Sequence, residues 1–224
     1  MTVGLSPHAV QRATVPPDRP DPSQRRRQWD ERYLSNFRPW DSGITPPEVV
    51  AFWRSGLLPY TGLAVDLGCG SGAHSAYLAG LGLRVIGVDL SGIALRRAWE
   101  RDAGYLAGKM RGASFVQADV ALLPLHDAAA HYILDIGCLH SIPRRQRSLY
   151  AQGVVDNLRP GGFYHLFAFD RVFDSSSDPE HSDRGVDKDE VRLLFAPFLS
   201  LLTVQRGRPD QQPCRWYLLY KRHA

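Results

Sequence analysis

Three glycines at alternate positions follow a short apolar run in the first half of the chain. The run, residues 63–67, is rich in strand-forming side chains, and Gly68, Gly70 and Gly72 come directly after it. Glycines at the turn from a strand into a helix let the backbone reverse tightly and let a ligand approach the main chain. The stretch therefore predicts a ligand-binding loop, with the carboxylate of Asp66 two residues before its first glycine.

Three further acidic residues stand at the ends of the next three predicted strands. They are Asp89, Asp119 and Asp135. In a parallel sheet the carboxyl ends of the strands meet at one edge, which is where ligands bind. A single Asp in such a place is often only a turn or helix cap, but four carboxylates at one edge indicate a binding site.

Two cofactors compete for this edge. The spacing of Gly68, Gly70 and Ala73 fits a dinucleotide-binding loop, so an NAD(P) oxidoreductase is one alternative. The pyrophosphate of a dinucleotide, however, disfavours a carboxylate such as Asp66 beside the glycines. S-adenosylmethionine (SAM) carries an ammonium group, a ribose diol and an adenine amine but no phosphate, so it suits an acidic edge better.

The spacing Asp66-x-Gly68-x-Gly70-x-Gly72, together with Asp89 and the pair Ala118-Asp119, resembles the first three motifs of class I SAM-dependent methyltransferases. The similarity runs from about Trp29 to Tyr220. It implies a Rossmann-like α/β fold, a doubly wound, mainly parallel sheet of seven strands with helices on both faces. It also implies that the glycine loop holds the methionine portion, Asp89 the ribose and Asp119 the adenine amine. The residues expected at the cofactor are Trp40, Asp66, Gly68, Cys69, Gly70, Gly72, Asp89, Leu90, Ser91, Asp119, Val120 and Asp135.

Two further groups of residues resemble one subgroup of these enzymes, the thiopurine and tellurite-resistance methyltransferases. One group is Trp-Asp-x-Arg-Tyr at 29–33 with Pro-Trp-Asp-x-Gly at 39–43. The other is Asp-x-Gly-Cys-Leu-His at 135–140 with Arg147 and Tyr150. The resemblance implies a small acceptor with a sulfur, selenium or tellurium nucleophile. Two alternatives stay open: O- or N-methylation of a small natural product, and a SAM-binding protein without turnover.

Methyl transfer is an in-line displacement at a sulfonium, so the protein mainly aligns the reactants and excludes water. A thiol acceptor reacts as its thiolate, which nearby positive charge favours. His140 and Arg147 are the candidate catalytic residues, because either can supply such charge and His140 can also accept a proton. The Cys138-x-His140 pair lacks the other ligands that a structural zinc needs, so no metal is expected.

The elements that must position these residues alternate between strands and helices. A helix over residues 28–36 and the loop around Trp40 are expected to fold over the glycine edge. The polar segment 170–189 is long enough to be a lid or a binding loop. Strands are expected at 63–67, 84–88, 114–117, 132–136, 163–169, 199–204 and 214–220, and further helices at 46–53, 73–79, 91–105, 143–158 and 188–195.

Composition excludes several other classes of protein. The chain has 224 residues with Lys+Arg 27 against Asp+Glu 23, which suits one methyltransferase domain over 29–224. Residues 1–28 hold five Pro and five Arg and read as a disordered arm. Most of the excess positive charge lies in this arm, so nucleic-acid binding is not expected. Three cysteines, with neither a signal peptide nor a membrane span in view, indicate a cytoplasmic protein, and the family resemblance implies a small-molecule partner.

Overall fold

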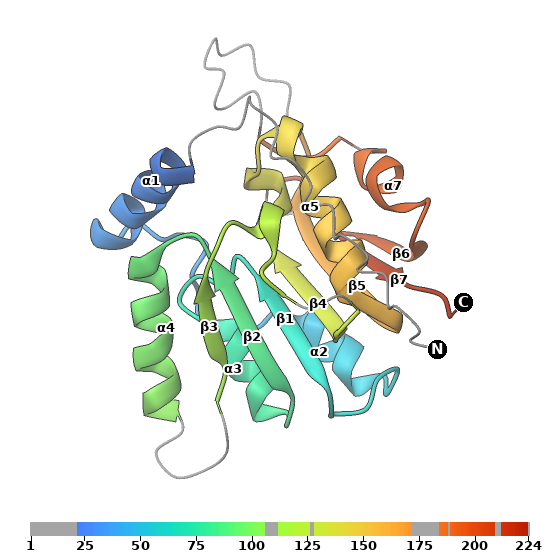
Figure 1. The fold of residues 1–224 in the computed structure, drawn as a ribbon, viewed down its shortest axis with the longest axis horizontal. Helices are drawn as coiled ribbons and strands as arrows, with labels where there is room; N and C mark the ends of the chain where they lie inside the picture. Colours follow the sequence, from blue (N-terminus) through green and yellow to red (C-terminus); the bar gives the residue numbers. More distant parts are fainter. Residues whose placement is uncertain are drawn as a thin grey trace, which may run out of the picture.

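The computed structural model describes residues 22–105, 112–125, 128–171, 184–187, 189–208 and 212–223. One seven-stranded sheet with the order β3-β2-β1-β4-β5-β7-β6 organises these residues (Figure 1). The strands are β1 (Leu63–Leu67), β2 (Arg84–Asp89), β3 (Ser114–Gln117), β4 (Ala130–Ile136), β5 (Leu158–Phe169), β6 (Ser200–Arg206) and β7 (Cys214–Tyr220). The first five run parallel, and β7 is antiparallel to both β5 and β6. The predicted Rossmann-like fold is confirmed.

Helices pack against both faces of this sheet (Figure 1). One apolar core joins the sheet to α5 and α7, and a second joins the opposite face to α2 and α3. The α-helices are α1 (Pro22–Leu34), α2 (Pro47–Arg54), α3 (Ala73–Gly80), α4 (Gly92–Tyr105), α5 (Arg144–Asn157) and α7 (Glu190–Phe195), and two short 3-10 helices are η1 (Val120–Leu122) and η2 (Leu139–Ser141). Of the described helices, none has the length and apolarity that a membrane crossing requires.

The central strands explain why the acidic residues gather at one edge. β1 is covered on both faces, and Val65 and Leu67 are fully buried, as expected for a central strand of a parallel sheet. Leu67 pairs in register with Val88 of β2 and with Asp135 of β4. The end of β1 therefore brings the glycine loop, the end of β2 and the end of β4 to the same edge.

Helix α1 begins earlier than the sequence analysis predicted. It starts at Pro22, inside the segment assigned to the disordered arm, rather than at residue 28. Residues 22–28 therefore belong to the helix, which corrects the boundary of the arm, while residues 1–21 lie outside the described part of the chain. The physical reason is tertiary: α1 packs against α4 (Figure 1) and buries Tyr33, contacts that the local composition does not reveal.

Asp135 has a structural role that differs from the predicted cofactor contact. Its side chain is fully buried, and its Oδ1 accepts a hydrogen bond from the backbone N–H of Cys138 at 2.7 Å. Its Oδ2 accepts from the backbone N–H of Leu139 at 2.9 Å and from the hydroxyl of Tyr150 at 2.5 Å. The carboxylate thus holds the turn after β4 and ties it to α5, a structural role that the sequence analysis did not predict, and its contact with the cofactor stays a prediction.

Arg147 likewise stabilises the fold. The side chain is 1% exposed, and its Nε donates to the carbonyl oxygen of Ile142 at 2.9 Å. Its Nη1 lies 2.9 and 3.0 Å from the two carboxylate oxygens of Glu190. This buried ion pair joins α5 to α7, which gives Arg147 a structural role, while its catalytic role stays a prediction.

Replacing Asp135 by Asn should remove a pH-dependent part of the stability. Burial raises the pKa of Asp135 from 3.8 to about 7, so the folded chain keeps a proton that the unfolded chain has released. The free energy of unfolding of the wild type, minus that of Asp135→Asn, should therefore fall as the pH rises from about 4 to about 7, by up to about 1.4 kcal/mol per pH unit. Urea unfolding of both proteins at several pH values measures this difference.

The other titrating groups are present in both proteins, so their contributions to the free energy of unfolding cancel in the difference. His140 is one of these, and its lowered pKa gives the opposite dependence of stability on pH. A difference in the free energy of unfolding that is constant or grows with pH would contradict the buried, proton-holding carboxyl group.

Candidate cofactor and acceptor site

The glycine loop has a backbone conformation that only glycine adopts easily. Gly68, Gly70 and Gly72 all have positive φ, at +67°, +53° and +76°. A Cβ atom added at Gly70 would lie 2.5 Å from the hydroxyl oxygen of Tyr33. The loop therefore brings bare backbone up to a side chain of the N-terminal helix, and α3 begins directly after it at Ala73.

Asp89 at the end of β2 holds the glycine loop in place. Its Oδ2 accepts a hydrogen bond from the backbone N–H of Gly70 at 2.9 Å, and its Oδ1 accepts from that of Ser91 at 2.8 Å. Burial raises the pKa of Asp89 to about 6. Leu90, between these residues, is half-buried. The carboxylate lies at the tip of its strand, where the ribose is expected.

Ser91 is a helix cap in this structure. Its hydroxyl oxygen accepts from the backbone N–H of Ala94 at 3.1 Å, and the hydroxyl donates to Oδ1 of Asp30 at 2.5 Å. Because Asp30 belongs to α1, this pair joins the N-terminal helix to the start of α4. The side chain is fully buried, and its hydroxyl both caps α4 and bonds α1.

Asp66 is buried beneath the glycine loop. Its Oδ2 accepts from the hydroxyl of Ser75 at 2.6 Å, and burial raises its pKa to about 6. A desolvated carboxylate of this kind gains most from a neighbouring cation, which would return its pKa toward the ordinary value. The charge and place of Asp66 therefore suit the ammonium group of a ligand.

Asp119 is already paired with a residue of α1. Its Oδ2 lies 2.6 Å from Nη2 of Arg25, with side chains that are 9% and 16% exposed. Its Oδ1 accepts from the backbone N–H of Ala121 at 3.1 Å and caps η1. Val120, in the same turn, is buried. The basic run at 25–27 thus reaches the acidic edge, which its solvated appearance in the sequence did not suggest.

Cys69 and Cys138 pack against glycines at the same edge. A Cβ atom at Gly87 would lie 2.8 Å from Sγ of Cys69, and one at Gly68 would lie 2.9 Å from Sγ of Cys138. Burial raises the pKa of both thiols well above the ordinary value, so they stay protonated. Among the described residues, three or more metal-binding side chains do not come together anywhere.

An aromatic cluster from the N-terminal segment covers the glycine loop. The rings of Trp29 and Trp40 meet edge to face at 5.6 Å, and Nε1 of Trp40 lies 3.5 Å from the hydroxyl oxygen of Tyr33. Trp40 stays 44% exposed, whereas Tyr33 is buried against Gly70. Sequence analysis predicted Trp40 at the cofactor but did not single out Tyr33, although the Trp-Asp-x-Arg-Tyr stretch contains it.

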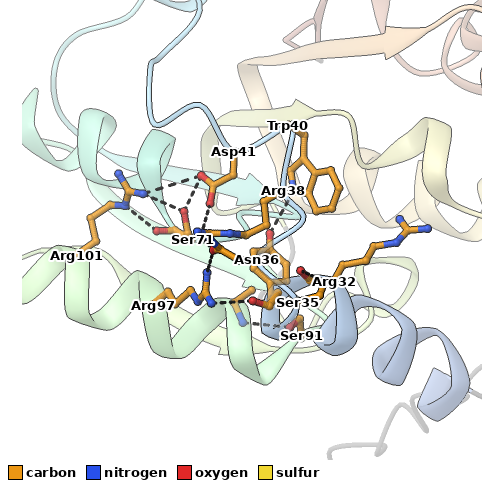
Figure 2. Close-up of polar contacts among 12 residues, drawn as sticks. Arg32, Ser35, Asn36, Arg38, Trp40, Asp41, Ser71, Ser91, Arg97 and Arg101 are labelled. Carbon is orange, nitrogen blue, oxygen red and sulfur yellow. Dashed lines mark hydrogen bonds and ion pairs between the residues drawn. The ribbon is translucent and has the colours of Figure 1, made fainter.

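A polar cluster fastens this cover to the loop (Figure 2). Asp41 accepts from the hydroxyl of Ser71 at 2.8 Å and from Nη1 of Arg38 at 3.0 Å. Arg101 of α4 donates from Nε to the carbonyl oxygen of Ser71 at 3.0 Å. Sequence analysis did not assign a role to Asp41, Ser71 or Arg101, because only the folded chain brings these segments together.

His140 lies on the side of the edge where β4 and β5 end. Its Nδ1 accepts from the backbone N–H of Phe169 at 3.1 Å, and its ring packs on that of Phe169 at 4.7 Å. Burial, with smaller contributions from Arg147 and Arg184, lowers its pKa to about 3. The imidazole is therefore neutral, which corrects the expectation that it supplies positive charge.

The predicted lid, 170–189, is described only at its two ends. Asp170 forms a parallel bridge with Val186, and α7 begins at Glu190 rather than at residue 188. Residues 172–183 and 188 lie outside the described part of the chain. The two described ends lie next to His140, since the backbone N–H of Gly185 donates to the carbonyl oxygen of His140 at 3.2 Å.

Comparison with known proteins finds a family whose model matches the segment that contains the site. Residues 64–162 match the family model described as a methyltransferase domain. A 2-heptyl-1-hydroxyquinolin-4(1H)-one methyltransferase of Mycobacteroides abscessus is 28% identical over 76% of this chain and 72% of that protein. A thiopurine S-methyltransferase of Aliivibrio salmonicida is 28% identical over 81% of this chain and 87% of that protein.

Solved structures agree with this result at the level of the fold. The 1,6-didemethyltoxoflavin-N1-methyltransferase of Burkholderia thailandensis, solved with its acceptor and S-adenosylhomocysteine, superposes with a TM-score of 0.68. It is 23% identical, and the match covers 97% of this chain and 99% of that one. The family match runs from β1 through the glycine loop and all four strand-end carboxylates, so the matched region is a methyltransferase domain, and the relatives support a class I SAM-dependent enzyme.

Proposed function

We propose that this methyltransferase acts on a small molecule whose nucleophile is a thiol or another chalcogen. Two relatives support the size and class of the acceptor, since one is named for a hydroxyquinolone and the other for thiopurine S-methylation. The exposed ring of Trp40 beside Trp29 supports a planar acceptor at the covered edge, because aromatic rings stack or meet edge to face.

We assign the cofactor contacts to the acidic edge. SAM supplies the activated methyl group when it is bound. Asp66 would hold the ammonium group, Asp89 the ribose hydroxyls and Asp119 the adenine amine. The hydroxyl of Tyr33 lies over Gly70, and Trp40 closes the loop from outside. These side chains would orient the donor and exclude water from an in-line displacement at its sulfonium.

The surroundings of His140 are the observation that supports the proposed nucleophile. Its Nδ1 already accepts a hydrogen bond from the backbone N–H of Phe169 at 3.1 Å, and burial lowers its pKa, so its imidazole is a poor base for a weakly acidic hydroxyl group. An acceptor that ionises by itself near neutral pH avoids this requirement, and thiols and selenols do so far more readily than alcohols. The hydroxyl of an acidic N-hydroxy heterocycle is the second candidate, favoured by the relative named for a hydroxyquinolone.

A panel of acceptors tests the proposed nucleophile. Enzyme and SAM are incubated separately with aromatic thiols, selenite, tellurite, iodide, 1-hydroxyquinolones and simple phenols, and S-adenosylhomocysteine is measured by mass spectrometry. We expect product with the thiols, and a rate that rises with pH through the pKa of each thiol rather than through one shared value. Product with phenols alone would overturn the chalcogen assignment.

Replacing Asp89 by Ala should weaken SAM binding about tenfold or more, because the change removes charged acceptors of hydrogen bonds. Isothermal titration calorimetry with SAM measures the dissociation constant. Asp156→Ala is the control, since that residue lies in α5 and its side chain bonds Gln152. Near-normal affinity of a folded Asp89→Ala protein would refute the assigned ribose contact.

Replacing Arg25 by Ala should strengthen SAM binding. Arg25 and the adenine amine compete for the same carboxylate oxygen of Asp119. Removing a partly buried ion pair worth about 1 kcal/mol should lower the dissociation constant about fivefold. Arg26→Ala is the matched control, because Arg26 is exposed on the same helix. Weaker binding by Arg25→Ala would mean that Arg25 assists the cofactor instead of competing with it.

A further inference from the structure

Arg171 lies two residues after the end of β5, at the edge of the sheet that carries the glycine loop. Its backbone N–H donates to the carbonyl oxygen of Val186 at 3.0 Å, and that of Val186 donates to Phe169 at 2.9 Å. His140 joins the same group of segments through its hydrogen bonds with Phe169 and Gly185. Arg171 and His140 therefore lie on the side of the edge formed by β4 and β5, away from the acidic residues that follow β2 and β3.

The guanidinium of Arg171 is buried and incompletely satisfied. The side chain is 9% exposed, and its Nε lies 3.1 Å from Oδ1 of Asp187. Its Nη2 is buried and, within the described residues, has no hydrogen-bond partner. Because a buried charged donor without a partner is costly, a partner that this structure does not contain is expected there.

The surrounding charges leave an excess of positive charge on this side of the edge. Asp187 is shared, since its Oδ2 lies 3.0 Å from Nη2 of Arg144. The other two carboxylates nearby are paired as well, Asp170 with Arg215 and Glu190 with Arg147. These described carboxylates are therefore already used in other ion pairs, and none of them is a hydrogen-bond partner of Nη2 of Arg171.

We propose that Arg171 binds an anionic oxygen substituent of the methyl acceptor, of the carboxylate class, and so selects for anionic acceptors. A guanidinium is suited to this because its planar donors match the geometry of a carboxylate. The neutral imidazole of His140, whose Nδ1 accepts a hydrogen bond, carries its proton on Nε2 and adds a second donor on the same side. The inference rests on the proposed function and adds the charge of the acceptor to it.

Two aromatic thiols, one with a free carboxylate and one with that group esterified, test the proposal. Thiosalicylate carries a carboxylate beside its thiol, and its methyl ester does not. Isothermal titration of the full chain, saturated with S-adenosylhomocysteine, gives the dissociation constant of each. We expect the wild type to bind thiosalicylate about tenfold more tightly than the ester, as one charge-assisted contact allows. Arg171→Gln should bind both compounds alike, with its affinity for SAM unchanged.

Arg144→Gln is the matched control. It removes the exposed arginine that shares Asp187, and we expect it to keep the preference for thiosalicylate. If Arg171→Gln does not fold, Arg171→Lys replaces it, and an approximately threefold loss of preference is then expected because one ammonium lacks the planar pair of donors. No preference in the wild type, a preserved preference in the Arg171 variant, or an equal loss in Arg144→Gln would each overturn the proposal.

Turnover separates this proposal from the proposed function. If a preference for thiosalicylate depends on Arg171 but SAM with any thiol yields no S-adenosylhomocysteine, the proposed thiol acceptor fails and the anion site stands. If thiols are methylated while the two probes bind equally in every variant, the anion site fails and the proposed function stands.

Discussion

Burial of carboxylates at one edge of a parallel sheet is the constraint on which the rest of the site depends. Burial raises the pKa of Asp66 and Asp89 to about 6, so each is costly to keep ionised unless donors or cations face it. The chain meets this cost with hydroxyl and backbone donors at Ser75, Gly70 and Ser91. Holding a cationic cofactor there satisfies the same requirement, because the positive charge compensates the desolvated carboxylates.

The N-terminal cover, which consists of α1 and the loop through Asp41, contacts residues of this edge. Helix α1 reaches the edge through Arg25 on Asp119 and through Asp30 on Ser91. The loop after it is fastened to the glycine loop by Asp41 and Ser71. Each of these contacts joins the cover to the segments that would hold the cofactor. On the proposed assignment of the adenine amine to Asp119, a ligand entering there would meet the guanidinium of Arg25.

The two halves of the edge differ in electrostatic character. Carboxylates dominate the side formed by β1, β2 and β3, while on the side where β4 and β5 end the carboxylates of Asp170, Asp187 and Glu190 are paired with arginines and His140 is neutral. A cationic donor on the first side and an electron-rich acceptor on the second would meet above β4. Such an arrangement would orient the two reactants by charge, and alignment of the reactants is the main contribution of a protein to methyl transfer.

Much of the fold could be predicted from local patterns. Strands β1, β3 and β7 have the predicted bounds, because apolar runs flanked by Gly, Pro and Asp identify them in the sequence alone. The alternation of strands with helices predicted the parallel part of the sheet. β5 begins at Leu158 rather than at residue 163, since its first residues gain their partners only from β4 and from the C-terminal strand region.

By itself, the sequence determined the glycine loop, the strand-end carboxylates and the cofactor class, because these depend on residue type and short-range spacing. Tertiary structure decided which polar groups serve the site and which serve the fold. Asp135 and Arg147 matched a functional pattern, yet each is satisfied by a partner that only folding brings near, Tyr150 and Glu190. Arg25, in contrast, read as solvated charge and reaches the acidic edge. Burial and hydrogen-bond partners arise from long-range contacts, so side-chain spacing alone cannot reveal them.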